Sequence, residues 1–475
     1  YDGRINIRGK GPFQPDLTLT EGPFVNELSA DGAVISFETN KPCMPQITVD
    51  GKTYSNLKEN GTHHEIQISG LEPGKQYAYT VKYGDNSETY SFKTAPKEGS
   101  RTAFTFAYAS DSRKATGGGE RDIYGVNAYV MKRMAVLAAK ENAVFMQFTG
   151  DLINGYSSRI GQQRLEYVNW KHSVEPFWHY FPFVIAPGNH EAFLKVFDNG
   201  SRYGVSVDNF PFKKVSAEKV FSDEFVNPPN GPVSEDGAVY DPDKKKADFP
   251  PYDETAYYYI YDNIAVVALN SNYWYTPNPH QIPLTGGNLH AYIMDNQLQW
   301  LKNTLAKLQK DDRIDHIFVT IHTPAFPNAG HSGDDMWYHG NNNMRPWVAG
   351  KPVEKGIIER RDQFLNLLIN ENTKVLALLC GDEHNYTRML INDSTPRYPK
   401  GYDKPKVALK RHLWQITNGS AGAPYYGQEK LPWSGFVKEY TTEHALMLFD
   451  VKGKKVTLRV INPDTFEKIE QVNLN

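Results

Sequence analysis

The sequence predicts an α/β domain preceded by an all-β sandwich. Between about residues 23 and 96, short stretches of alternating apolar and polar residues are separated by turn residues, which is typical of antiparallel strands. From residue 102 onward, continuous apolar runs alternate with helical patterns, which indicates buried parallel strands joined by helices. A chain of 475 residues is also long enough for more than one domain.

The predicted organisation has three parts. Residues 1–15 contain Gly, Pro and basic residues without periodicity and are expected to be an irregular lead-in. Residues 16–97 form the sandwich, and residues 102–475 form the α/β domain after a short linker. The end of the chain, residues 444–472, reads as two or three further strands, which we place at the outer edge of a second sheet.

Charge and composition exclude some classes of partner. Lys plus Arg number 52 against 55 Asp plus Glu, so the near-balance argues against a nucleic acid or an anionic membrane as the main partner. No apolar run is long enough to span a membrane, so no integral membrane segment is expected. Cys43 and Cys380 are far apart in the sequence and are predicted to be free buried thiols. Because the chain opens at Tyr1 without a methionine, the absence of an export signal is uninformative.

Two predicted strands end in side chains that can bind metal. The apolar run 144–149 is followed by Gly150-Asp151, and the run 181–187 is followed by Gly188-Asn189-His190-Glu191. A glycine lets the backbone turn tightly and brings the next side chain to the carboxyl edge of the sheet, where ligands bind in open α/β folds. A single Gly-Asp is more often a helix N-cap. Gly-Asn-His-Glu after a second such strand is harder to explain in that way.

Other predicted strands end in the same manner. Asp111 follows the strand that begins at residue 102, and His322 follows the strand 316–320. The strand 375–380 ends in Gly381-Asp382-Glu383-His384. Oxygen and imidazole ligands at successive strand ends are expected to meet at one edge of the fold.

This order of motifs resembles the calcineurin-like metallophosphoesterases. The stretch 69–77 (Ser-Gly-Leu-Glu-Pro-Gly-Lys-Gln-Tyr) also resembles the corner of a fibronectin type III domain, whose tyrosine hydrogen-bonds across a turn. With a fibronectin type III-like domain in front, the sequence looks most like the purple acid phosphatase branch, over roughly residues 20–470. The resemblance implies a four-layer α/β fold, in which two mixed sheets are flanked by helices.

The resemblance also implies a centre of two metal ions. One ion would be bound by Asp111, Asp151 and His384, and the other by Asp151, Asn189, His322 and Asp382. Such a pair, divalent or mixed-valence (Mn, Fe, Zn, Mg or Ca), binds phosphoryl oxygens and activates a water as nucleophile. His190 would lie near the leaving group as general acid, or near a phosphoryl oxygen as a stabilising donor.

The sequence departs from the family pattern at several positions. Asp382 stands where the family has histidine, and Asn154 stands where the purple enzymes have a tyrosine ligand, with Tyr156 two residues further on. An oxygen-rich set favours Mn, Mg or Ca over Zn. Arg113 occupies a position that is often His or Gly. It could grip a substrate oxyanion, or it could form a salt bridge to Asp382 or Glu383.

Two loops are candidates for substrate binding. His331 and His339 lie in an irregular insertion, residues 326–356, that we expect to overhang the site. The stretch 419–426, which includes Tyr425, resembles the family's small-residue loop near the metals. Close backbone packing explains that second loop equally well.

These features predict a secreted, periplasmic or cell-surface metal-dependent phosphoesterase. Its substrate would be a small-molecule, glycan or lipid phosphate ester, and the sequence does not identify partner proteins. One alternative is a phosphodiesterase for a bulky glycan or lipid phosphate, which the long insertions and the aromatic content of 13% would suit. The other is a binding module that lost activity when Asp382 replaced histidine.

Overall fold

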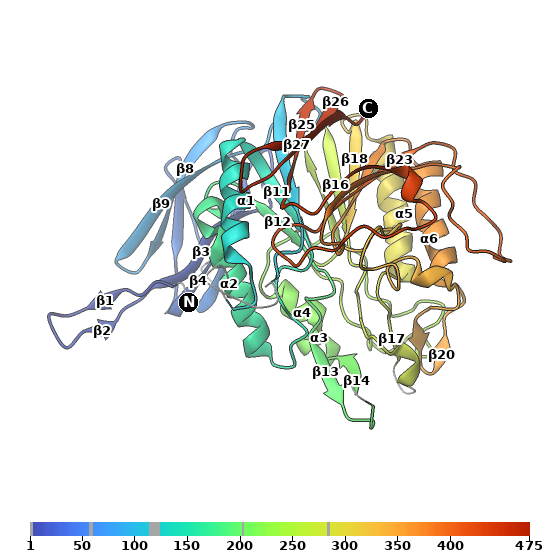
Figure 1. Ribbon diagram of the computed structural model, residues 1–475. Helices are drawn as coiled ribbons and strands as arrows, with labels where there is room; N and C mark the ends of the chain where they lie inside the picture. Colours follow the sequence, from blue (N-terminus) through green and yellow to red (C-terminus); the bar gives the residue numbers. More distant parts are fainter. Residues whose placement is uncertain (1–2, 57–59, 114–123, 202–203, 283–285) are drawn as a thin grey trace.

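The computed structural model describes residues 3–56, 60–113, 124–201, 204–282 and 286–475. An N-terminal sandwich packs beside a larger domain in which stacked sheets lie between helices (Figure 1). Ahead of the sandwich, β1 (Ile7–Arg8) and β2 (Gln14–Pro15) pair as a hairpin where irregular chain was expected. Each strand is only two residues long, too short for an alternating pattern to show in the sequence.

The sandwich consists of a sheet with the order β3-β4-β7 and a sheet with the order β6-β5-β8-β9. Buried residues alternate with exposed ones along β8, as expected for strands with one face in the core. Tyr77 accepts a hydrogen bond from Glu72 N at 2.9 Å, so the predicted tyrosine corner is present. The bounds are β3 Leu19–Asn26, β4 Ala33–Cys43, β5 Gln46–Val49, β6 Lys52–Tyr54, β7 Gly61–Ile68, β8 Gln76–Tyr83 and β9 Asn86–Lys93.

The first sheet of the larger domain has the order β12-β11-β10-β25-β26-β27. β10, β11 and β12 are parallel, and β25 pairs antiparallel with β10. The placement of residues 444–472 in a second sheet was therefore wrong. Those strands extend the sheet that begins at residue 104, because sequence patterns do not show which edge a distant strand joins. The bounds are β10 Phe104–Ala109, β11 Ala143–Thr149, β12 Phe183–Ala186, β25 Leu446–Lys452, β26 Lys455–Ile461 and β27 Lys468–Asn473.

The second sheet has the order β15-β16-β18-β21-β23-β22-β24. Its central strands β16, β18, β21 and β23 are parallel, so their carboxyl ends lie at one edge. The bounds are β15 Tyr257–Tyr261, β16 Ile264–Leu269, β18 His316–Ile321, β21 Val375–Cys380, β22 Tyr386–Ile391, β23 Leu413–Asn418 and β24 Val437–Thr441.

Helices cover the outer faces of both sheets, which confirms the predicted four-layer architecture (Figure 1). α1 (Ala128–Lys140) and α2 (Ile160–Trp178) pack on the first sheet, and α5 (Asp295–Lys310) and α6 (Ile357–Leu365) pack on the second. Aromatic rings fill the layer between the sheets. Phe106 stacks on Phe145 and Phe449 with ring centroids 5.0 and 4.7 Å apart.

Short elements lie in the connections between these layers. A π-helical turn, Asn366–Asn370, continues α6. The other elements are β13 Leu194–Phe197, β14 Val205–Asp208, α3 Phe212–Val215, α4 Ala217–Ser222, η1 Pro279–Gln281, β17 Gly286–Gly287, η2 Tyr338–Gly340, β19 Trp347–Val348, β20 Lys351–Pro352 and η4 Ser434–Phe436.

The sandwich is fixed to the larger domain through α2. Trp178 Nε1 donates to Val25 O at 3.0 Å, and Tyr79 Oη donates to His179 O at 2.9 Å. The buried ammonium of Lys171 pairs with Glu21 at 2.5 Å and with Glu224 at 2.9 Å. Breaking one partner of such a buried network is costly, so the two domains are held in one arrangement.

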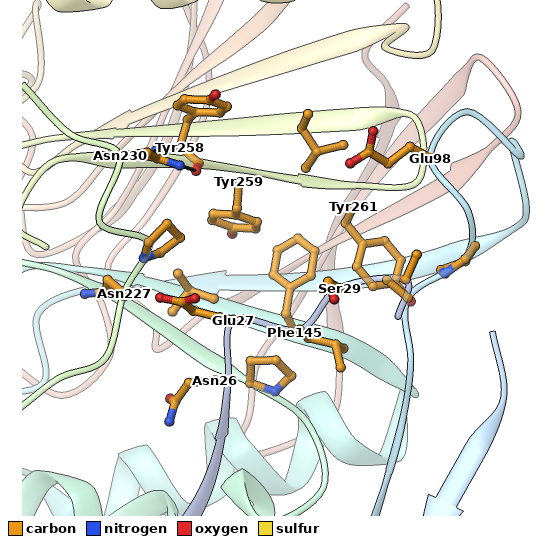
Figure 2. Close-up of a pocket in the computed structure, with 18 of the residues that line it drawn as sticks. Asn26, Glu27, Ser29, Glu98, Phe145, Asn227, Asn230, Tyr258, Tyr259 and Tyr261 are labelled. Carbon is orange, nitrogen blue, oxygen red and sulfur yellow. Dashed lines mark hydrogen bonds between the residues drawn. The ribbon is translucent and has the colours of Figure 1, made fainter. Parts of the chain in front are cut away.

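A cavity of about 540 Å³ lies at the junction of the sandwich and the sheets (Figure 2). Phe145, Tyr258, Tyr259 and Tyr261 provide much of its aromatic lining. Among the described residues that line it, none is a predicted metal ligand. The chemistry predicted from the sequence must therefore be sought at the carboxyl edge of the sheets.

Both cysteines are free, as predicted, although Cys43 is less buried than expected. Cys43 is half-buried, and Cys380 is fully buried. Each helix in the described part of the chain is too short or too polar to cross a bilayer.

Candidate metal centre

Three aspartates follow strands of the two sheets in an unusual backbone conformation. Asp111, Asp151 and Asp382 come after β10, β11 and β21, and their φ angles are 64°, 53° and 65°. A non-glycine residue in this left-handed region costs on the order of 1–3 kcal/mol and is concentrated at binding sites. The turn points each carboxylate back across the sheet edge, and all three are buried.

Glycine at position 150 allows this close packing. Its φ is +87°, and a Cβ there would lie 2.3 Å from His322 Nδ1. Any side chain would displace the imidazole that follows β18. Both the left-handed turn and the close approach of His322 from the neighbouring sheet therefore require glycine before Asp151.

The aspartates and histidines form two groups that share one carboxylate. Asp111, Asp151 and His384 offer ligand atoms within 4.8 Å of one another, and so do Asp151, His322 and Asp382. His322 Nε2 lies 3.1 Å from Asp151 Oδ1 and 3.3 Å from Asp382 Oδ1. Asp151 therefore stands between two places that could each hold a cation.

Asn189 completes the second group. Its Nδ2 donates to Tyr156 Oη at 2.5 Å, and its Oδ1 faces His322 Nε2 at 3.0 Å. With the amide reversed, Nδ2 would donate to His322, Asp151 and Asp382 at 3.0–3.2 Å. That reversed arrangement suits a site without a cation. A cation requires the oxygen to face inward, because an amide nitrogen has no free lone pair.

Backbone carbonyls fix the tautomers of the histidines. Nδ1 of His322 donates to Thr149 O at 2.9 Å, and Nδ1 of His384 donates to Pro424 O at 2.5 Å. His190 uses Nδ1 in the same way, toward Asn154 O at 2.5 Å. Because a carbonyl only accepts, Nδ1 carries a proton in each ring, so Nε2 is the nitrogen that offers a lone pair to a cation once its own proton is lost, as metal-binding histidines need.

Neighbouring charges shift the pKa values of the shared groups. Burial raises the pKa of Asp151, but the imidazoles of His190 and His322 lower it more, so its pKa lies below the usual range. Burial lowers the pKa of His322, and the Asp151 and Asp111 carboxylates then raise it well above its ordinary value. A proton on His322 thus balances charge that a bound cation would balance instead.

The residues fit a pair of divalent cations. Asp111 is fully buried, and its Oδ1 has no hydrogen-bond partner, although its Oδ2 accepts from Asp382 N at 2.9 Å. His384 Nε2 faces that oxygen at 3.5 Å, and a buried carboxylate oxygen without a hydrogen bond is expensive unless a positive charge neutralises it. Carboxylate, amide and imidazole donors together suit Mn, Fe, Zn or Mg.

Arg113 faces the cluster, but its partner differs from those predicted. Its Nε lies 3.7 Å from Asp151 Oδ2, so Asp151 rather than Asp382 or Glu383 is its ion-pair partner. That Nε is buried without a hydrogen bond, and Nη2 approaches Tyr426 Oη at 3.4 Å. The guanidinium is thus positioned at the centre with a donor still free.

The loop residues separate into those inside and those outside the site. His331 Nδ1 lies 3.5 Å from Asp382 Oδ2, whereas His339 is exposed. Tyr425 is 70% exposed, and it is Tyr426 that stacks on His384 with ring centroids 4.1 Å apart. The structure therefore brings His331 and Tyr426 to the site and leaves His339 and Tyr425 outside it.

Two glutamates hold the strand-end loops in place. The Glu191 carboxylate accepts from Asp151 N and Leu152 N at 2.8 Å and from Gly188 N at 2.6 Å. Glu383 accepts from Asn328 N at 2.9 Å and His331 N at 3.2 Å. Both glutamates belong to motifs noted in the sequence, where Glu191 had no assigned role and Glu383 was a possible ion-pair partner of Arg113.

Sequence analysis missed His290 and Asp335. His290 Nε2 lies 2.9 Å from Asp382 Oδ2 and 3.2 Å from Asp335 Oδ1. Neither residue follows a predicted strand, so the strand-end rule could not find them. A histidine inside the apolar stretch 289–294 was the available signal.

Comparisons with known proteins bear on the family and the fold. Residues 122–386 match the model of the calcineurin-like phosphoesterases, and residues 20–94 match the N-terminal domain of purple acid phosphatases. The fold is similar to a purple acid phosphatase from yellow lupin (Lupinus luteus), with a TM-score of 0.63 and 13% identity, over 98% of this chain and 78% of that one. It is also similar to PhoD, with a TM-score of 0.58 and 14% identity, over 95% of this chain and 88% of that one.

Proposed function

The chain belongs to the calcineurin-like phosphoesterase family, and from this premise we propose that it hydrolyses phosphate esters at a pair of metal ions at the carboxyl edge of its sheets. Membership of the family places it among metal-dependent phosphoester hydrolases. The proposal adds the ligands of the pair. They are Asp111, Asp151 and His384 for one ion, and Asp151, Asn189, His322 and Asp382 for the other.

The position of Asp151 is the observation that carries this proposal. Its carboxylate belongs to both ligand groups. His190 N donates to Asp151 Oδ1, and Glu191 accepts from the backbone N of Asp151 and so holds its turn. One carboxylate shared by two cation sites is the arrangement that a two-metal hydrolase needs. A structural salt-bridge network has no need of two such groups on either side of one aspartate.

Each part of the site has a chemical task. When bound, the cations supply Lewis acidity and lower the pKa of coordinated water. Arg113 keeps a free Nε donor and a planar fork that can bind a phosphoryl oxygen. His190 is partly exposed, with Nε2 3.7 Å from Asp151 Oδ2, so it can reach a group bound at the metals.

The protonation of His190 decides its task. Burial lowers its pKa below the ordinary value, Asp151 opposes that shift, and Arg113 adds to it. A neutral imidazole, with its proton on Nδ1, accepts at Nε2. An imidazolium donates there, and we propose that the donor form protonates the leaving alkoxide.

The choice between monoesters and diesters is tested by turnover. The protein is stripped with a chelator, reloaded with Mn²⁺, Zn²⁺ or Mg²⁺, and assayed with p-nitrophenyl phosphate and bis-p-nitrophenyl phosphate. We expect metal-dependent hydrolysis of at least one ester, and Asp151→Asn should reduce it at least about a thousandfold, or about 4 kcal/mol.

Asp208→Asn is the matched control, because Asp208 is a buried carboxylate outside the candidate groups. It should retain the activity of the unsubstituted protein. If metal-loaded protein binds phosphate but turns over neither ester, the binding-module alternative replaces the enzyme.

A further inference from the structure

The side of Asp382 that faces away from the metal pair meets a second set of ligands. Its Oδ1 lies 3.3 Å from His322 Nε2, within the pair, whereas its Oδ2 lies 2.9 Å from His290 Nε2. His290 Nε2 is also 3.2 Å from Asp335 Oδ1. One carboxylate thus links the candidate centre to a neighbouring group of buried ligands.

The ligand atoms of this neighbouring group converge. His290, Asp335 and Asp382 each offer an atom within 4.8 Å of the other two. A single Nε2–H would have to be shared between the two carboxylates, and each of two shared hydrogen bonds is bent and weaker than a straight one. A nitrogen lone pair and two carboxylate oxygens that point at one place are, in contrast, the usual environment of a cation.

Burial makes some neutralising charge necessary. His290, Asp335 and Asp382 are 5%, 0% and 1% exposed, so water screens the two carboxylates poorly. Oδ2 of Asp335 has no hydrogen-bond partner, although its residue is fully buried. Two facing carboxylates and an unsatisfied oxygen are disfavoured in a protein interior unless something positive lies between them.

We propose that His290, Asp335 and Asp382 bind a third divalent cation next to the metal pair. The inference rests on the proposed two-metal centre, because Asp382 would bridge the two sites, with Oδ1 toward the pair and Oδ2 toward the third ion. The bridge also explains the departure from the family at position 382. A histidine there would offer the pair one nitrogen and have no second oxygen for a neighbour.

The loop 326–356 supplies the outer part of this site. His331 Nδ1 lies 3.5 Å from Asp382 Oδ2 and 3.1 Å from Asp334 Oδ1. Its ring is inclined by 28° to that of His290, with 5.9 Å between the centroids. Glu383 accepts from His331 N and so holds the loop in this position. Imidazole nitrogens combined with carboxylates favour Mn²⁺, Fe²⁺ or Zn²⁺ over Ca²⁺.

Metal stoichiometry tests the third site without reference to activity. Full-length protein is stripped, reloaded with Mn²⁺ or Zn²⁺, desalted and analysed by elemental mass spectrometry. The unsubstituted protein should hold three equivalents. Asp335→Asn and His290→Gln, which keep the side-chain size, should each lose one equivalent and keep two, and the two that remain show that the variant is folded. Asp208→Asn should hold all three.

The possible outcomes separate the two proposals. Two equivalents in the unsubstituted protein and in both variants would overturn the third site, and would mean that a shared proton joins Asp335 to Asp382, while the two-metal centre stands. Loss of all metal in both variants would also overturn it, because His290 and Asp335 would then only support the pair. No metal in the unsubstituted protein would overturn the two-metal centre itself.

Discussion

The sandwich and the carboxyl edge of the sheets differ in whether their buried polar groups are neutral and hydrogen-bonded. In the sandwich, His64 is buried against Thr39 Oγ1 at 3.1 Å, and burial lowers its pKa to about 4, so it is neutral and paired. At the sheet edge, Asp111 keeps a buried oxygen without a hydrogen bond and a left-handed backbone. The difference teaches that the sandwich is arranged for stability, whereas the edge retains charge and strain that only a ligand compensates.

The largest expected effect is at the shared carboxylate. Asp151→Ala should lose both metals of the pair and reduce hydrolysis at least about a thousandfold, or about 4 kcal/mol. In chelator, where no cation is bound, the variant should be less stable to denaturant than the unsubstituted protein, because Arg113 and His322 lose their buried ion-pair partner. Full metal occupancy in the variant, measured by elemental analysis, would remove the model of a shared ligand.

A substitution in the sandwich core should reduce stability without changing metal binding or activity. Ile35 is fully buried in the sandwich core, so Ile35→Ala should destabilise the sandwich by about 2–5 kcal/mol. Metal content and activity of the folded fraction should remain unchanged. Denaturant unfolding followed beside elemental analysis checks both. If fully folded Ile35→Ala protein lost metal, the sandwich core would influence the metal centre, and the two regions would not be independent.

His190→Ala tests the chemistry at the edge. A general acid matters most when the leaving group is poor, so the loss should be about 10²–10⁴-fold on alkyl phosphates and much smaller on nitrophenyl phosphates. His339→Ala changes an exposed histidine of the overhanging loop and should leave both rates unchanged. An equal loss on both esters would instead make His190 an oxyanion donor.

Substitution of Tyr156 should have a smaller effect than substitution of His190, and Tyr156 should not colour an iron-loaded protein. Its hydroxyl contacts Asn189 Nδ2 at 2.5 Å, and burial raises its pKa well above the ordinary value, so it stays a phenol. Iron-loaded protein should therefore lack a phenolate charge-transfer band. Tyr156→Phe should weaken metal affinity by about 10–100-fold, as for other groups that orient a ligand. A purple iron form would show that a tyrosine binds the metal after all.

The smallest effect concerns pH in the sandwich. Hydrogen bonds to Glu38 and Glu65 raise the pKa of His63 from 6.5 to about 10. The pKa is raised on folding, so the stabilisation is complete below pH 6.5 and is lost as the pH rises toward 10. Because the side chain is 47% exposed, solvent weakens the effect. His63→Gln and the unsubstituted protein should converge in thermal stability at high pH, and a constant difference across that range would contradict this assignment.

The sequence predicted the strand-end aspartates because their signal is local. A buried apolar run, a glycine and a carboxylate define both the strand and the direction of the next side chain, as at Asp151. The loops that carry His290, Asp335 and Tyr426 have no periodicity. Only the folded structure shows which side chains these residues contact. Tyr425 and Tyr426 illustrate this limit, since a shift of one residue separates an exposed side chain from one that stacks on His384.

The sequence could not predict which sheet β25 joins, for the same reason. Pairing between β10 and β25 connects Phe106 with Phe449, which lie far apart in the sequence and carry no mark of their partner. The position of the metal centre did not depend on it. Parallel strands fix their carboxyl edge locally, whatever strand is added beyond them.

Anomalous diffraction from crystals reloaded with Mn²⁺ tests the two-metal centre most directly. The account predicts strong peaks on both sides of the Asp151 carboxylate, one against Asp111 and His384 and the other against Asn189 and His322. An active, Mn-loaded protein with no peak at either position would contradict it, and so would ions bound only outside the strand ends.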